Sequence, residues 1–339
     1  MTTAATTAGA IHAVDLSISP PRARNPFLLA GTFPGASSYY QQRQVYGGSN
    51  NDPDTSFYSQ TGNRLNMSVS TPLQPDDAMT VTLTARQVNE IRHFVPLENL
   101  LIFTSGSEWR VGSGENSGFS IETLSQEPQS ELGSSHHRPI IAGETILFVE
   151  DGSARVIGLN FSLEPNKYVG TDMNQLADHL LAEEGPASFV VSDWAYASVP
   201  ESRLYVVRSD GQLLTMTLDK AQLVVAWTHW DTDGSFESVT SLKRSLSGVE
   251  DGIYLTVQRT IDGNTVRYVE RLSTRKFSDV RDAFFVDCGL TLDSSVTITG
   301  ATAANPVVVT AASHGLSNGD DVFVTGVVGM TQLNGNFYT

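Results

Sequence analysis

The chain has 339 residues, 40% of them hydrophobic and 17% charged, which excludes a wholly disordered protein. It carries 37 acidic and 21 basic residues, which give a formal net charge of −16. Proteins that bind nucleic-acid phosphates usually carry a net positive charge instead. A single cysteine excludes an intramolecular disulfide and a thiolate zinc site. No stretch approaches the roughly 18 apolar residues of a membrane-spanning helix, so we predict no such segment, and we see no signal peptide.

Residues 1–35 are rich in Thr, Ala, Pro and Ser. Pro20-Pro21 and Pro26 favour extended backbone, so we predict an extended N-terminal arm. Apolar side chains in a free tail would be exposed to water. Phe27, Leu28 and Leu29 therefore favour docking of the arm. A disordered terminus is the alternative, and the sequence leaves both open.

Two short helices are predicted between strands. The spacing from Thr84 to Gln87 is that of a capping box and predicts a helix that ends at Pro96. A second helix is predicted over 172–184, where three leucines lie on one helical face (Leu176, Leu180 and Leu181).

The remaining apolar runs are typical of strands joined by tight turns. Asp-Gly is favoured where both central turn residues need a positive φ. We therefore predict hairpins at Ser105-Gly106, Asp151-Gly152, Asp210-Gly211, Asp233-Gly234 and Asp262-Gly263.

Strands in immediate succession over 203–242 indicate an up-and-down meander of the size of one propeller blade. We predict a mainly β fold, a β-propeller-like array of antiparallel sheets with two short helices, over residues 36–293. A pair of ordinary β-sandwiches is the alternative. From residue 294 the sequence is rich in Val, Thr and Gly, which predicts a separate, incomplete small β module over 294–339.

The sequence contains little that indicates catalysis. Its seven histidines form no HExxH pattern, and His136-His137 is either a solvated loop pair or, less favourably, part of a metal site. No nucleophile elbow or phosphate-binding loop is present. We predict that the protein is not an enzyme and uses no cofactor or metal, with a propeller glycosidase as the least favoured alternative.

Several blocks, taken together and in order, resemble the tail nozzle (tail tubular protein B) family of short-tailed bacteriophages. They span residues 39–48, 53–63, 89–111, 174–181, 224–242 and 251–272. The residues that carry the resemblance, which the family implies to be structural, include Arg43, Gly47, Gly48, Pro53, Trp109, Trp227, Asp233, Gly234, Arg259, Gly263, Glu270 and Arg271. Arg259, Glu270 and Arg271 have the charges for cross-strand ion pairs.

The resemblance implies a phage virion structural protein, assembled in the host cytoplasm as a homohexameric ring at the distal tail. The ring would surround the exit channel, pass double-stranded DNA without specific binding, and link the tail adaptor ring to fibres or spikes. An acidic channel would repel phosphate and let DNA slide. The alternative is a receptor- or glycan-binding tail protein that uses exposed aromatic side chains.

The C-terminal stretch is similar to a small β module that recurs in phage tail proteins and resembles a module of ubiquitin-activating enzymes. The match rests on His314, Gly315, Gly319, Asp320, Gly326, Gly329, Met330, Asn334, Gly335 and Tyr338. The family module continues further, so we expect this chain to be a fragment with an open strand edge near residues 336–339.

Overall fold

The computed structural model describes residues 25–114, 117–152, 154–181, 189–219, 221–222, 224–246, 249–261, 263–283, 286–289, 296–320 and 322–338. The chain divides into two compact units, Met1–Phe284 and Phe285–Thr339.

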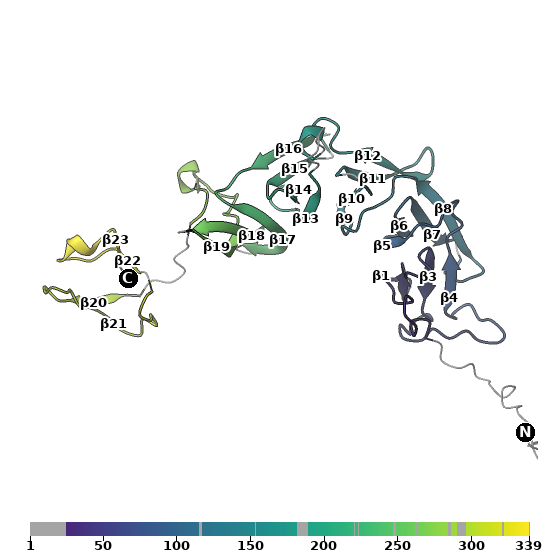
Figure 1. Ribbon diagram of the computed structural model, residues 1–339, viewed down its shortest axis with the longest axis horizontal. Coiled ribbons are helices and arrows are strands. Elements are labelled where there is room, and N and C mark those ends of the chain that lie inside the picture. The colour runs from purple at the N-terminus through teal and green to yellow at the C-terminus, as the bar shows by residue number, and fades with distance from the viewer. Residues whose placement is uncertain are drawn as a thin grey trace, which may run out of the picture. The chain divides into compact units, whose positions relative to one another are not determined.

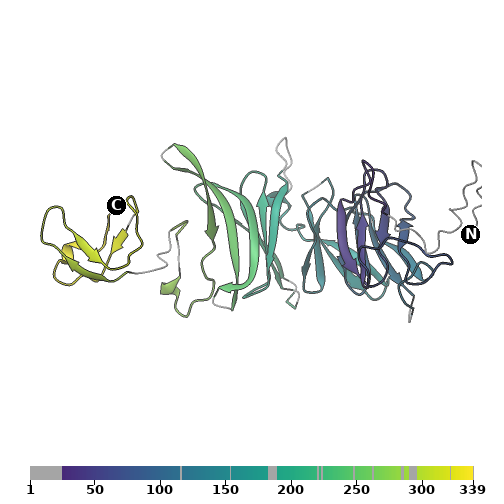
Figure 2. The same cartoon turned by 90° about the horizontal axis from the view of Figure 1, so that it is seen from below.

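The first unit consists of antiparallel sheets whose strands follow chain order (Figures 1 and 2). The first sheet contains β1 (Ala36–Tyr40), β2 (Arg43–Gly47), β3 (Thr55–Tyr58) and β4 (Met79–Thr82). The second contains β5 (Ile91–Pro96), β6 (Leu100–Thr104), β7 (Glu108–Ser113) and β8 (Leu124–Ser130). The third contains β9 (Ile140–Ala142), β10 (Thr145–Val149), β11 (Val156–Ser162) and β12 (Lys167–Asp172).

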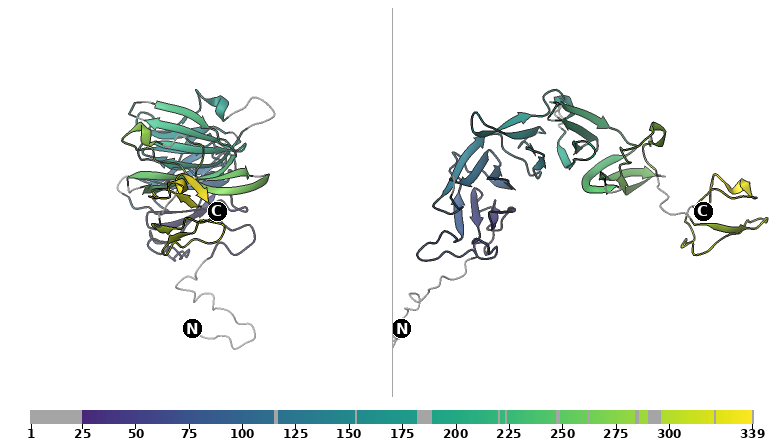
Figure 3. Two further views of the ribbon diagram at one scale, coloured as in Figure 1. Left: turned by 90° about the vertical axis from the view of Figure 1, so that its left-hand side faces the viewer. Right: turned by 180° about the vertical axis from the view of Figure 1, so that it is seen from behind.

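Two further sheets complete this unit (Figure 3). The fourth sheet contains β13 (Val191–Ala197), β14 (Arg203–Arg208), β15 (Leu213–Asp219) and β16 (Val224–Trp230). The fifth contains β17 (Ser235–Leu246), β18 (Glu250–Ile261) and β19 (Asn264–Arg271).

Each hydrophobic core of this unit lies between two successive sheets. In β6, Leu100 and Ile102 pack in the core shared with the first sheet, whereas Leu101 and Phe103 pack in the core shared with the third. Successive side chains of a strand point to opposite faces, so a strand buried on both faces needs a continuous apolar run. This explains LLIFT in β6, TILFV in β10 and LYVV in β14.

The mainly β prediction is confirmed: the chain is built from several antiparallel four-stranded sheets. Their up-and-down order and face-to-face succession are those of propeller blades. The blade boundary was predicted wrongly, however. The fourth sheet begins at Val191 and ends at Trp230, so the strand Ser235–Leu246 belongs to the next sheet and not to a meander over 203–242.

The first predicted helix is wrong. Residues 84–90 form no helix, and Ile91–Pro96 is strand β5, paired with β6. Phe94 packs toward the first sheet and Val95 toward the third, which is a strand's alternation. Long-range pairing with an apolar strand therefore outweighs a local capping pattern.

The second predicted helix, over 172–184, is also not observed as such. Asp172 ends β12, and the described part of the segment forms a three-residue 3-10 helix, Asp178–Leu180. Leu181 is buried between the third and fourth sheets, but Leu176 is 92% exposed. Residues 182–188 lie outside the described part of the chain. A second short 3-10 helix, Val280–Asp282, follows the fifth sheet.

Four of the predicted hairpins are confirmed, because β6 pairs with β7, β10 with β11, β14 with β15, and β18 with β19. The hairpin at Asp233-Gly234 is wrong. The strands on either side of it, β16 and β17, lie in different sheets, and this turn carries the chain from the fourth sheet to the fifth.

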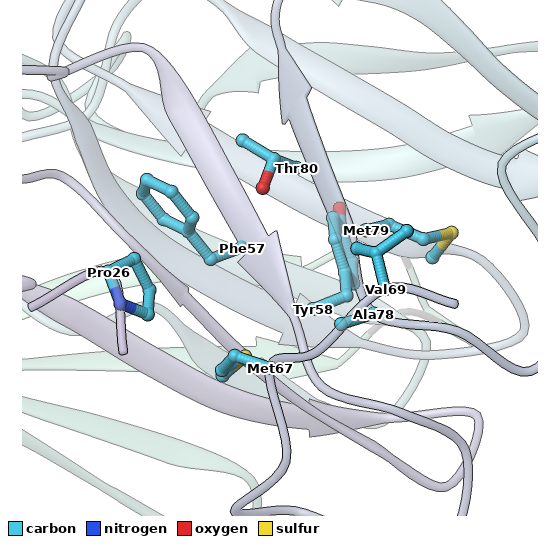
Figure 4. Close-up of a pocket in the computed structure, with 8 residues that line it drawn as sticks. All are labelled: Pro26, Phe57, Tyr58, Met67, Val69, Ala78, Met79 and Thr80. Atoms are coloured by element: carbon cyan, nitrogen blue, oxygen red, sulfur yellow. The ribbon is translucent and has the colours of Figure 1, made fainter. Parts of the chain in front are cut away.

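The described end of the N-terminal arm docks on the first sheet. The Phe27 ring lies 5.2 Å from the Tyr46 ring and 5.3 Å from the Phe57 ring, on the face opposite the core. Beside it lies a cavity of about 10 Å³, lined by Pro26, Phe57, Tyr58, Met67, Val69, Ala78, Met79 and Thr80 (Figure 4). Such a volume holds a water at most. Leu28 and Leu29 remain exposed, and residues 1–24 lie outside the described part.

The second unit contains two hairpins. One pairs β20 (Ile298–Ala301) with β21 (Val309–Ala311), and the other pairs β22 (Val322–Val324) with β23 (Asn336–Tyr338), after the 3-10 helix Thr331–Leu333. Val324 and Leu333 are its buried apolar residues among those described. Within the described residues β23 pairs with β22 alone, so its other edge is open.

Candidate functional site

The residues that carry the family resemblance lie mostly where sheets meet. At the first joint, the amide of Ile91 donates to the carbonyl of Pro53 over 2.8 Å. Gly48 has a φ of +67°, and a Cβ there would lie 2.1 Å from the Ile91 carbonyl oxygen. A Cβ on Gly47 would lie 2.7 Å from the Phe94 ring. Glycine at both positions therefore allows the first sheet to approach β5.

Arg43 lies at the start of β2 and is fully buried. Its guanidinium donates to the carbonyls of Ser59 at 2.7 Å, Asp77 at 2.6 Å and Pro75 at 2.9 Å. Burial lowers the pKa of Arg43, and the nearby Asp76 and Asp77 carboxylates oppose that shift. Arg43 thus clamps the end of β3 to the loop that precedes β4.

The two tryptophans of the resemblance serve different joints. Trp109 packs in the core between the first and second sheets, and its indole N–H donates to the Ser107 hydroxyl over 2.8 Å. Trp227 lies on β16, and its indole N–H donates to the carbonyl of Met173 over 2.8 Å. That bond ties the fourth sheet to the segment that follows the third.

A charged cluster stabilises the crossing to the fifth sheet. Arg259 makes a two-pronged ion pair with Glu270, at 2.6 and 2.8 Å, and donates to the Asp233 carbonyl at 2.8 Å. A Cβ on Gly234 would lie 2.4 Å from the Gln258 carbonyl oxygen, so glycine is required by the close approach of β18.

The expected ion pair between Arg259 and Glu270 is thus present, while Arg271 stands opposite Tyr254 and outside this cluster. Gly263, with a φ of +78°, lies in the turn between β18 and β19. The structure therefore brings the predicted residues together in small structural groups rather than in one site.

A buried carboxyl group lies at the start of β7. Glu108 is 1% exposed, and its Oε2 accepts hydrogen bonds from the Ser130 hydroxyl and, at 3.4 Å, from the Leu132 amide. Its Oε1 has no hydrogen-bond partner among the described residues. Burial raises the pKa of Glu108 to about 7, and the nearby Glu150 carboxylate adds to this shift. Glu108 belongs to the block 89–111 that carries the resemblance, but its place directly after a turn does not indicate that its carboxyl group is buried.

A groove of about 530 Å³ opens between β16 and the segment 172–180. Its lining residues are Asp172, Met173, Gln175, Leu176, Ala177, His179, Leu180, Val225, Ala226, Trp227, Thr228 and His229. The sequence analysis did not predict this groove. One feature of the sequence marks its β16 wall: Val224–Trp230 is rich in apolar and aromatic residues and contains no Pro, Gly, Lys, Arg, Asp or Glu.

The part of the chain that the structure describes contains no group of three or more His, Cys, Asp or Glu side chains able to hold a metal ion. His136 is exposed, and the Nδ1 of His137 lies 3.1 Å from the Ser135 hydroxyl. No helix within the described ranges has the length and hydrophobicity needed to cross a bilayer.

No known protein-family description matches the sequence, and no curated protein matches it. Solved structures with some similarity include the β-propeller domain of Cps50 (Swd1) from Myceliophteria thermophila, at 8% identity and a TM-score of 0.33, covering 66% of this chain and 80% of that one. A luciferin-regenerating enzyme has 8% identity and a TM-score of 0.27, covering 66% and 83%. The Malassezia sympodialis allergen Mala s 1 has 12% identity and a TM-score of 0.29, covering 64% and 72%.

Proposed function

We propose that this chain is a tail nozzle protein of a short-tailed bacteriophage. In this proposal it is a virion structural protein, not an enzyme, and needs no cofactor. Six copies form a ring around the DNA exit channel and link the tail adaptor ring to fibres or spikes. One observation carries the proposal: the residues that resemble the family gather at the joints between sheets, at Ile91, at Trp227 and around Arg259.

These contacts are those of a scaffold. Gly48 permits close packing of two sheets, and the buried side chain of Arg43 donates to the carbonyls of Ser59, Asp77 and Pro75. Neither arrangement positions a reacting group. A ring that guides DNA needs shape and rigidity, and the net charge of −16 adds repulsion of the phosphate backbone.

The test is the native mass of the full chain by light scattering, followed by negative-stain imaging of the same peak. We expect a mass near six protomers and particles with a central hole. A monomer would be mixed with the adaptor ring, which the proposal requires as partner. A chain that stays monomeric and does not bind the adaptor overturns the proposal.

A second candidate, a glycan-binding tail protein, is favoured by one observation. Trp230 at the end of β16 is 36% exposed, and His229 beside it lies 3.7 Å from Asp231. Aromatic faces bind sugar rings by apolar contact. Protection of tryptophan fluorescence from a soluble quencher by host polysaccharide, lost in Trp230→Ala, would support this candidate over the nozzle.

A further inference from the structure

The outer edge of the fourth sheet differs from the outer edges of the three sheets before it. Edge strands expose unpaired backbone groups, and proteins usually protect them with charges, Pro, irregularities or short length. Strand β8 contains Glu127 and Pro128, β12 contains Lys167 and Gly170, and β4 has only four residues. Strand β16 has seven residues and none of these features. It is therefore an edge suited to accept another strand.

The groove lies beside this edge. Residues 225–229 of β16 line the groove without a break, and the exposed Leu176 lies on the opposite wall. The side chains of Val225, Trp227 and His229 lie on one face of this strand, because successive side chains of a strand alternate between its two faces. A strand added to β16 would make backbone hydrogen bonds with it and place every second side chain on this side of the sheet. The geometry therefore selects an extended segment with apolar residues at alternate positions.

The N-terminal arm contains such a segment. Val14, Leu16 and Ile18 alternate with Asp15 and Ser17, and Pro20-Pro21 follows. All three apolar side chains of an extended 14–18 segment point to one face. The polar side chains then face away from the groove.

The arm is too short to reach β16 of its own copy. Phe27 is fixed on the outer face of the first sheet, and three sheet-to-sheet steps separate that sheet from the fourth. Face-to-face sheets are spaced by roughly 10 Å, so an arm that passes over the two intervening sheets must cover about 30 Å. The seven residues from Ile18 to Asn25 span at most roughly 25 Å when extended.

We propose that residues Val14–Ile18 of one copy add as a strand to β16 of a neighbouring copy, with Val14, Leu16 and Ile18 in the groove. This inference rests on the proposed ring and names one of its contacts. The contact is head-to-tail, because the arm and the acceptor edge are different surfaces, and repeated head-to-tail contacts can close into a ring.

Disulfide trapping in the full chain tests the contact. The exposed Cys288 is first replaced by Ser. Leu16→Cys is then combined with Val225→Cys or, in a separate variant to allow for register, with His229→Cys. We expect oxidation to link different copies, seen as a ladder on a non-reducing gel. Leu16→Cys with Val169→Cys on the exposed edge strand β12 is the matched control and is expected to stay unlinked.

A charge placed in the groove gives a second readout. Val225→Lys is expected to weaken self-association at least tenfold, whereas Val169→Lys on β12 leaves it unchanged. The arm contact is overturned if the ring forms normally with Val225→Lys and the cysteine pairs of Leu16 with Val225 or His229 give no cross-link. The nozzle proposal would remain intact in that case, because the ring still forms.

If the wild-type chain is monomeric, a synthetic peptide of residues 10–19 is titrated against the full chain. Saturable binding that is lost with Leu16→Asp in the peptide supports the arm contact even though the ring has failed. Absence of binding by both peptides overturns the contact.

Discussion

Arg43 is a buried cation whose partners are mainly backbone carbonyls. Replacing it by methionine keeps much of its volume but leaves the carbonyls of Ser59, Asp77 and Pro75 without their donor. Each orphaned buried carbonyl costs about 1–3 kcal/mol. We therefore expect Arg43→Met to lower the free energy of unfolding by about 3–5 kcal/mol in urea denaturation.

The exposed Arg86 provides the control for that substitution, since Arg86→Met removes the same charge from the surface. Its effect is expected to stay within about 0.5 kcal/mol. Equal losses in the two variants would contradict the clamp described for Arg43.

Glu108 predicts an unusual pH dependence of stability. Its pKa is raised to about 7 in the folded protein, so the folded state keeps a proton that the unfolded chain releases near pH 4.5. Stability is therefore full below that pH and falls as the pH rises toward 7. In Glu108→Gln this loss is absent. We expect the free energy of unfolding of the variant, relative to wild type, to rise by roughly 2–3 kcal/mol between pH 4.5 and 8.

The difference from wild type is measured because burial also lowers the pKa of His93. His93 makes stability rise with pH, opposite to the effect of Glu108, and it does so equally in wild type and in Glu108→Gln. Glu122→Gln, at an exposed position, is the control. Parallel pH curves for wild type and Glu108→Gln would show that this carboxyl group titrates as it does in the unfolded chain.

At the scale of elements, two glycines with a similar positive φ allow the cost of left-handed backbone to be measured separately from the cost of a steric clash between sheets. Gly48 has a φ of +67° and Gly62 a φ of +74°, but a Cβ would collide with the Ile91 carbonyl in one case and meet no atom within 4 Å in the other. We expect Gly62→Ala to cost about 1 kcal/mol for the left-handed backbone. Gly48→Ala is expected to cost at least about 3 kcal/mol by the same denaturant measurement, because strand β5 must also move. Similar costs would contradict the close joint.

The correctly predicted hairpins and the wrong one at 233–234 show which features of the fold are determined by local sequence. Asp-Gly at 151–152 and 210–211 predicted hairpins correctly, because a tight turn depends on its own residues. The same dipeptide at 233–234 was assigned wrongly. Gly234 is needed there for close approach to Gln258, a contact that no local pattern reveals.

The predicted helix ending at Pro96 failed for a related reason. Val88, Ile91 and Arg92 satisfy helical spacing in the sequence. In the structure, however, Ile91 and Phe94 pack in the core shared with the first sheet, and Val95 packs in the core shared with the third. The groove escaped prediction because it needs β16 and the segment 172–180, which are brought together only by folding. The local sequence thus predicts strands and turns better than it predicts the contacts between sheets.

At the scale of the whole molecule, the net charge of −16 makes a simple prediction about DNA. In the proposed ring, a channel through which DNA slides must not bind the duplex. We expect no saturable binding of duplex DNA by fluorescence anisotropy, even near 50 mM salt, where phosphate contacts are strongest. Saturable binding that weakens steeply with added salt would instead indicate a basic contact surface.

The alternation of side chains in β6, β10 and β14 has a consequence for how the protein opens. Each of these strands supplies apolar residues to the cores on both of its faces, so one sheet cannot unfold without exposing parts of its two neighbours. In such a nearest-neighbour array, the interior sheets are coupled most strongly and the terminal ones least. Within the first unit, amide hydrogen exchange should therefore be slower in β6, β10 and β14 than in the outer strands β4 and β19, with unfolding that begins at the two terminal sheets.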